Sequence, residues 1–170
     1  PDGEWIAFVR NRGTNNNLGI MKADGTQIRY LTEFTDGTQL YTPRWSPDGQ
    51  SLALSISRRG QRDIAILRLD EVESSQRLAG GAGAPGVLAA LQASEVGQSW
   101  NRTSLLRPLV ATAGTDRDPV WTTDGAEVVF SSDTSGIFNI YAVDVRTAAI
   151  RQLTNLIGGG IGPAVSANGA

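Results

Sequence analysis

A seven-residue motif recurs along the chain and limits the folds open to it. It reads Pro-Arg-Trp-Ser-Pro-Asp-Gly at residues 43–49, Pro-Val-Trp-Thr-Thr-Asp-Gly at 119–125 and, with more changes, Pro-Ala-Val-Ser-Ala-Asn-Gly at 163–169. Its last three residues also stand at 1–3. Proline fixes φ, aspartate can bond its own backbone, and glycine accepts the left-handed conformation. Each copy therefore predicts a tight turn between two strands.

The residues after each turn repeat as well. Apolar side chains stand three and five positions after the motif glycine, as Ile6 and Phe8, Leu52 and Leu54, and Val128 and Phe130. The residues between them, Ala7, Ala53 and Val129, are also apolar. A strand that is apolar on both faces is typical of a sheet packed between two others.

Each unit continues through a second glycine turn into two more predicted strands. The expected third strands are residues 18–22, 63–69 and 139–144, and the expected fourth strands are 27–32, 105–110 and 149–154. Two of the fourth strands end almost alike, in Arg-Tyr-Leu-Thr and Arg-Gln-Leu-Thr. Four short strands in each unit of about 40–50 residues indicate the blades of a β-propeller. The fold class predicted is therefore all-β, with antiparallel four-stranded meanders amounting to three blades.

These motifs resemble the TolB-like, WD-repeat-like family of β-propeller repeats. The resemblance rests on the turn motif, on Asp-Ile at 63–64 and Asn-Ile at 139–140, and on the Arg-x-Leu-Thr endings. It covers nearly the whole chain outside one insertion, and it implies a propeller of six blades.

Three blades cannot close a ring, since propellers have about four to eight. Two alternatives remain open: the chain is part of a longer propeller, which we favour as its natural origin, or identical chains complete one another. In the second case a final strand at 161–166 pairs with residues 4–10 of a neighbour. Open strand edges invite association, so we expect the isolated chain to self-associate as a homo-oligomer.

The middle unit carries an insertion. We expect one domain, residues 1–170, with residues 71–103 inserted in the third-to-fourth strand hairpin of the second blade. Leu88 and Leu91 lie in a helix-favouring stretch, and Trp100 follows in a polar setting. These three residues are a candidate partner-binding patch, because long loops on rigid scaffolds often carry function. The alternative is a loop that folds its apolar residues back on the blade.

Composition excludes several kinds of chemistry. The chain has no histidine and no cysteine, so Ser-His-Asp catalysis, thiol catalysis and imidazole or thiolate metal ligands are impossible within it. Lys and Arg number 15 against 17 acidic residues, with no basic stripe, which argues against a nucleic-acid partner. No apolar run reaches the length of about 18 residues that spans a membrane. We predict no catalytic residue, no cofactor and no metal.

Two acidic residues precede one of the predicted first strands, which line the channel of a propeller. Asp116 and Asp118 are candidates for the channel mouth, where a carboxylate pair can attract a cation. The other reading is a solvated charged turn. The motif residues Ser46, Thr122 and Asp48 are interpreted as turn-forming residues and not as functional-site residues.

We predict a non-catalytic scaffold module for protein–protein interaction, as the resemblance to TolB-like propellers implies. A bacterial envelope protein in a periplasmic or other extracytoplasmic location is expected. One alternative is the substrate-gating propeller of a prolyl-oligopeptidase-type hydrolase whose catalytic domain lies outside this chain. Another is a carbohydrate-binding propeller.

Overall fold

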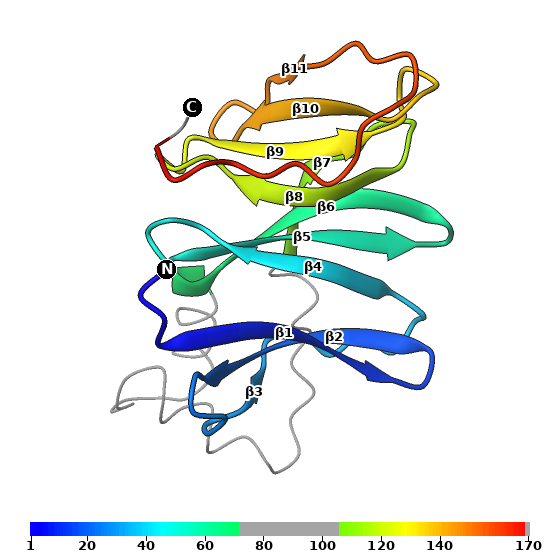
Figure 1. Ribbon diagram of the computed structural model, residues 1–170. Helices are drawn as coiled ribbons and strands as arrows, with labels where there is room; N and C mark the ends of the chain where they lie inside the picture. Colours follow the sequence, from blue (N-terminus) through cyan, green and yellow to red (C-terminus); the bar gives the residue numbers. More distant parts are fainter. Residues whose placement is uncertain (72–105, 169–170) are drawn as a thin grey trace.

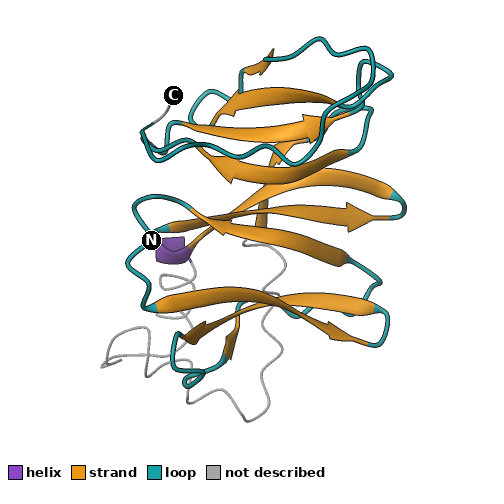
Figure 2. Ribbon diagram, in the orientation of Figure 1, coloured by secondary structure: helices purple, strands orange, loops and turns teal. Residues whose placement is uncertain are grey.

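The computed structural model describes residues 1–71 and 106–168, and in these ranges it is built of strands. They form three antiparallel sheets stacked side by side, as Figure 1 shows. We call these sheets blades 1, 2 and 3, in chain order. A single helical turn at 69–71 is the only helix among the described residues (Figure 2). None of the described residues belongs to a helix of the length and apolarity that crossing a bilayer requires.

Each blade is a meander in which consecutive strands pair. Blade 1 consists of β1 (Trp5–Arg12), β2 (Asn15–Lys22) and β3 (Arg29–Tyr30). Blade 2 consists of β4 (Gln39–Trp45), β5 (Ser51–Arg58), β6 (Gln61–Arg68) and β7 (Leu106–Val110). Blade 3 consists of β8 (Asp116–Trp121), β9 (Glu127–Ser132), β10 (Asn139–Asp144) and β11 (Ile150–Gln152). The predicted all-β propeller architecture is confirmed.

The motif glycines close the turns in the predicted way. Gly49 and Gly125 have φ of 69° and 70°, in the left-handed region that glycine accepts without strain. Their N–H groups donate to the carbonyls of Ser46 and Thr122, at 2.9 and 3.0 Å. The turns that join β4 to β5 and β8 to β9 are therefore two copies of one structure.

The strand β5 shows why both of its faces are apolar. Leu52 and Leu54 point into the core between blades 1 and 2, whereas Ala53 belongs to the core between blades 2 and 3. All three side chains are fully buried. The alternation along a strand sends neighbouring residues to opposite faces, so a strand in a central blade carries apolar residues on both faces.

The inner strands β4 and β8 share a bulge that the sequence did not reveal. The register shifts between Tyr41 and Arg44 in β4, and between Arg117 and Val120 in β8. In each strand the residue seven positions before the motif glycine, Thr42 or Asp118, has a positive φ, of 47° or 55°. A bulge of this kind bends the strand and increases its twist.

The final strand predicted at 161–166 does not form within the single chain, and its pairing with a neighbour stays a prediction. These residues have no ladder, because none of the described strands pairs with them. They nevertheless contact blade 3 in the same way as the inner strand β8 contacts blade 2. The Gly162 N–H donates to Ser131 Oγ at 3.0 Å, and the Asp118 N–H donates to Ser55 Oγ at 3.2 Å. Gly162 also has a positive φ, 66°, at the same repeat position as Asp118.

The outermost strands are shorter than predicted. β3 covers two residues instead of 27–32, and β11 covers three instead of 149–154. The reason in blade 1 is local, since Gln27 has φ of 52° and breaks the extended conformation. The Leu31 N–H still donates to the Leu18 carbonyl at 2.8 Å, and past Leu31 side-chain hydrogen bonds, described below, replace the ladder.

The two ends of the insertion are held together at the outer edge of blade 2. β6 and β7 pair directly, and residues 69–105 connect them. The Arg107 guanidinium makes an ion pair with Glu71 at 2.9 Å. This pair is largely exposed on the arginine side, so it fixes geometry more than it adds stability.

Candidate functional site

The candidate partner-binding patch falls outside the described part of the chain. Leu88, Leu91 and Trp100 all lie between residues 72 and 105, so their role stays a prediction.

The two channel-mouth candidates have structural partners. Asp116 is fully buried, and its carboxylate accepts hydrogen bonds from the backbone N–H and the hydroxyl of Thr112, both at 2.9 Å. Asp118 pairs with Arg117 at 2.8 Å. Among residues 1–71 and 106–168, no group of three or more acidic side chains lies close enough to hold a metal ion. The two aspartates lie on one strand, where Asp116 is held by Thr112 and Asp118 is paired with Arg117.

The hydroxyls of the turn motif serve the backbone. Ser46 Oγ donates to Asp48 at 2.5 Å and accepts from the Ser51 N–H at 2.9 Å. Thr122 does the same with Asp124, at 2.6 Å, and with the Glu127 N–H, at 3.0 Å. These contacts confirm the interpretation of the motif as turn chemistry, and they occupy the hydroxyls that a nucleophilic reading would require.

These turns make the stability of the fold depend on pH. The Ser46 hydroxyl, followed by the Gln50 N–H, holds the pKa of Asp48 below its ordinary value of 3.8, and Thr122 and the Ala126 N–H do the same for Asp124. A carboxylate whose pKa is lowered by folding contributes stability above the unfolded pKa and loses it as pH falls through the folded pKa.

We therefore expect the unfolding temperature to fall as pH drops below about 4, the ordinary aspartate value. The variant Asp48→Asn/Asp124→Asn should have a lower unfolding temperature at pH 7 and a flatter profile below pH 4, because asparagine does not titrate. Calorimetric scans of both proteins across this pH range make the comparison. An equally steep acid transition in the double variant would contradict the assignment.

A second hydrogen-bond network repeats between blades 1 and 3. In blade 1, Thr32 Oγ1 donates to Asn17 Oδ1 at 3.1 Å and accepts from the Leu18 N–H at 2.8 Å. In blade 3, Thr154 and Asn139 make the corresponding contacts, with the Ile140 N–H as donor at 2.9 Å. The Thr of Arg-x-Leu-Thr thus replaces the outer strand's ladder, which explains why β3 and β11 are short.

Blade 2 departs from this network. It has Asp63 at the asparagine position, and Ala111 instead of a threonine directly follows Val110. Burial, with the charge of Asp116 as a smaller cause, raises the pKa of Asp63, while a hydrogen bond from Gln61 opposes the change. The pKa of Asp63 is raised whereas that of Asp48 is lowered, so ionisation of Asp63 at neutral pH destabilises the folded chain.

Replacement of Thr32 by valine should lower the free energy of unfolding by about 1–3 kcal/mol. Valine has nearly the same shape as threonine but no hydroxyl, so the buried Leu18 N–H loses its acceptor. Thr32 is 1 % exposed. The matched variant Thr154→Val removes the same bonds at a half-buried position, where water can replace them, so its cost should be smaller. Denaturant unfolding of both variants measures the difference, and equal costs would contradict the argument.

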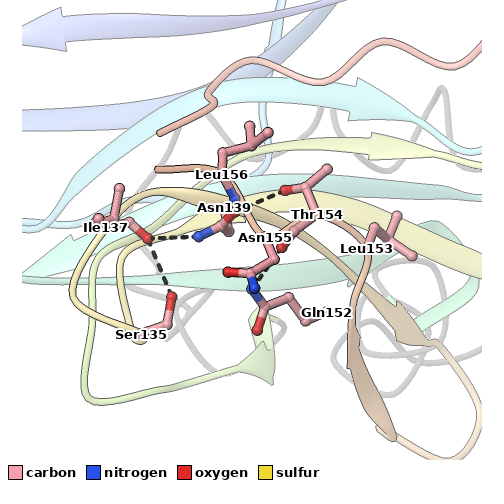
Figure 3. A pocket seen from close by; sticks show the side chains of 8 residues that line it. All are labelled: Ser135, Ile137, Asn139, Gln152, Leu153, Thr154, Asn155 and Leu156. Atoms are coloured by element: carbon pink, nitrogen blue, oxygen red, sulfur yellow. Dashed lines mark hydrogen bonds between the residues drawn. The ribbon is translucent and has the colours of Figure 1, made fainter. Parts of the chain in front are cut away.

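A hollow of about 370 Å³ lies on blade 3, at the β10 and β11 edge. Figure 3 shows Asn139 at its centre, where the side chain bonds the backbone on both sides of the hollow. Its Oδ1 accepts from the Leu156 N–H at 2.8 Å, and its Nδ2 donates to the Ile137 carbonyl at 3.3 Å. The lining is made of amides, hydroxyls and aliphatic groups, namely Ser135, Ile137, Asn139, Gln152, Leu153, Thr154, Asn155 and Leu156.

The leucines of this hollow are more exposed than the equivalent residues of blade 1. Leu31 and Phe34 of blade 1 are 2 % and 3 % exposed, since blade 2 covers them. Leu153 and Leu156 have the same repeat positions in blade 3, and they are 42 % and 43 % exposed. Because the lining holds no acid or base, the arrangement can bind a surface but offers no proton transfer. The hollow is an uncharged depression in which two leucines of blade 3 are exposed. Sequence reasoning missed it, although the repeat alignment of these leucines was available.

The comparisons agree with the fold. No protein-family model matches the chain. Its sequence is 42% identical over 48 residues to the Tol-Pal system protein TolB of Nitrosomonas europaea, covering 28% of this chain and 11% of that protein. It is 27% identical over 148 residues to the uncharacterized peptidase YuxL of Bacillus subtilis, covering 78% of this chain and 21% of that protein. The chain thus spans a minor part of both relatives.

Solved structures are similar over nearly the whole chain. A putative TolB from Agrobacterium tumefaciens superposes with a TM-score of 0.72 at 19% identity, covering 99% of this chain and 49% of that one. TolB from Acinetobacter baumannii has a TM-score of 0.66 at 21% identity, covering 99% and 34%. The β-propeller domain of a protease from Pyrococcus furiosus has a TM-score of 0.57 at 14% identity, covering 92% and 41%. The chain has the fold of the TolB-like β-propellers, and its described residues form three of their blades.

Proposed function

We propose that this chain is a non-catalytic propeller module that binds another protein. The observation that carries the proposal is the role of the polar residues in the repeat. The side chains of Ser46, Thr122 and Asn139 make their hydrogen bonds within their own blade. A scaffold that is held together in this way offers its loops and inner strands as binding surface.

The similarity to TolB supports a role in the bacterial envelope. The relative from N. europaea is named for a Tol-Pal system, so we propose a protein partner of the Pal kind and a periplasmic or other extracytoplasmic location. The inner strands are the surface we assign to this partner. Arg44 is exposed on β4, and Arg117 and Asp118 form an ion pair on β8.

Calorimetric titration of the chain with a purified Pal protein tests the proposal. We expect saturable binding, weakened about tenfold or more by Arg44→Glu, since reversal of an interfacial charge is costly. Arg146→Glu is the matched control, because Arg146 is also exposed but lies in the turn between β10 and β11. Absence of binding, or equal effects of the two reversals, would contradict this partner and this surface.

The similarity to peptidase YuxL favours one other candidate, a propeller that gates access to a hydrolase domain. That function requires a catalytic domain outside this chain. The coding sequence around the segment distinguishes the two, since a Gly-x-Ser-x-Gly motif in a following α/β domain indicates a hydrolase. A Pal-binding result without such a domain would eliminate the hydrolase reading.

A further inference from the structure

We propose that Arg29 is the centre of a binding site for a small carboxylate ligand on the outer strand of blade 1. Arg29 lies on β3, the strand of that blade farthest from the inner side (Figure 1). The site is separate from the inner strands that we assign to the protein partner, so the inference does not depend on the proposed function. It rests on a comparison of Arg29 with two arginines at the same repeat position.

Each blade carries an arginine at one ladder position of its outer strand. The pairs across the ladders are Arg29 with Ile20, Arg107 with Ile66, and Arg151 with Ala142. In blades 2 and 3 this arginine holds a glutamate through the same two nitrogens. Arg107 Nε and Nη2 reach Glu71 at 3.0 and 2.9 Å, and Arg151 Nε and Nη2 reach Glu127 at 3.1 and 2.7 Å. The repeat position therefore favours a planar carboxylate bound by two parallel bonds.

Blade 1 has no carboxylate at this place. Glu127 is the second residue after its motif glycine, and the corresponding residue of blade 1 is Trp5. The Arg29 guanidinium lies over the Trp5 ring, with 5.1 Å to the ring centroid. Its Nη2 donates to the side-chain oxygen of Gln27 at 3.1 Å. Within residues 1–71 and 106–168, no carboxylate forms an ion pair with Arg29.

The burial of Arg29 makes the missing counter-charge costly. Arg29 is 8 % exposed, and Ile20, which lies opposite it on the same face, belongs to the core between blades 1 and 2. Burial also lowers the pKa of Arg29, because it disfavours the charged form. A buried charge that is not paired destabilises the fold, and a bound carboxylate would compensate it.

The unused nitrogens of Arg29 remain within reach of a small molecule. In the part of the chain that the structure describes, the fully buried side-chain atoms without a partner are Asn16 Oδ1 and Trp45 Nε1. Neither belongs to Arg29, so its Nε keeps contact with solvent although none of the described residues accepts from it. A small carboxylate fits this access, whereas a folded protein surface does not.

Gln27 occupies half of the expected ligand position. Its amide oxygen accepts from Nη2, which in Arg107 and Arg151 bonds a glutamate oxygen. Gln27 also has a positive φ of 52°, an uncommon conformation for a residue with a side chain. A carboxylate that replaces this amide would bind Nε and Nη2 together. Charge-assisted bonds are roughly twice as strong as neutral ones, so the exchange is favourable.

A titration with sodium acetate, followed by NMR of ¹⁵N-labelled protein, tests the proposal. Sodium chloride keeps the ionic strength constant throughout. We expect the Arg29 Nε–H and Trp5 indole N–H resonances to shift saturably, with a dissociation constant in roughly the millimolar range for so small a ligand. Chloride alone should not produce these shifts, because it cannot form two parallel bonds with the guanidinium.

The variant Gln27→Glu gives the sharpest test, because it supplies a carboxylate of nearly the same shape from the chain itself. We expect it to fold and to weaken acetate binding by about tenfold or more, since acetate must then displace a charged partner. Arg107→Gln is the matched control. It removes an arginine whose carboxylate is already in place, so acetate binding at Arg29 should stay within about twofold.

Three results would overturn the proposal: no saturable shift at Arg29, an equal response to chloride, or unchanged acetate binding in Gln27→Glu. A further variant distinguishes a ligand from the chain's own acidic residues. Glu73 and Glu95 lie outside the described residues. Acetate binding that appears only in Glu73→Gln/Glu95→Gln would mean that the chain itself fills the site, and the ligand proposal would be wrong.

Discussion

Replacement of Phe130 by alanine is expected to lower the free energy of unfolding by about 3–5 kcal/mol, the range for a buried phenylalanine. Phe130 is fully buried between blades 2 and 3, and its ring stacks on Tyr141 with 5.7 Å between centroids. The truncation leaves a cavity at a blade interface whose backbone is fixed by ladders on both sides. At this chain length the loss corresponds to a fall of about 6–20 °C in unfolding temperature.

Phe8→Ala is the matched control for this prediction. Phe8 stands at the same repeat position, five residues after the motif glycine, but on the open face of blade 1, where it is half-buried. Its ring meets Tyr30 edge-on at 6.2 Å. Measured at concentrations where the chain is monomeric, its cost should be less than half that of Phe130→Ala. Equal losses would mean that blade packing does not distinguish the two sites.

Gly114→Ala should destabilise the chain by about 1–3 kcal/mol, the usual cost of inserting a group into a packed region. A Cβ at this position would lie 2.5 Å from the Thr134 backbone nitrogen and 2.6 Å from a carboxylate oxygen of Asp133. The nitrogen belongs to the main chain of blade 3, so it cannot move aside cheaply. The Asp133 carboxylate also accepts the Thr115 N–H at 2.6 Å, which ties the two segments together.

Gly158→Ala provides the comparison, because a Cβ there meets no atom within 4 Å and the residue has no positive φ. Its effect should be within about 0.5 kcal/mol of zero, as for surface substitutions in general. Chemical denaturation of the two variants under one condition suffices. A neutral Gly114→Ala would show that the loop of blade 2 and the turn of blade 3 are not in contact.

Repetition is what made much of the fold predictable. The turn motif and the offsets of residues such as Leu52 and Val128 locate the central strands, because a strand buried on two faces carries apolar residues on both of them. The same offsets identified Ser46 and Asp48 as turn residues, and their hydrogen bonds agree.

The outer strands and the candidate sites were less predictable. The sequence does not show that Thr32 and Asn17 replace the ladder beyond Leu31, since that bond joins residues 15 positions apart. It also presented Asp116 as a channel candidate, although Thr112 holds it as a buried structural carboxylate. Partners of this kind are set by the approach of loops, which composition does not encode.

The sequence by itself determined the blade: four strands, a glycine-closed turn and two apolar faces, because local turn chemistry and alternation specify them. Only the tertiary structure decided which of these equal faces are covered. Leucine stands at the same repeat position as Leu31 and as Leu153, yet Leu31 is buried and Leu153 is exposed. The difference comes from a neighbouring blade, and burial is a property of the stack rather than of the repeat.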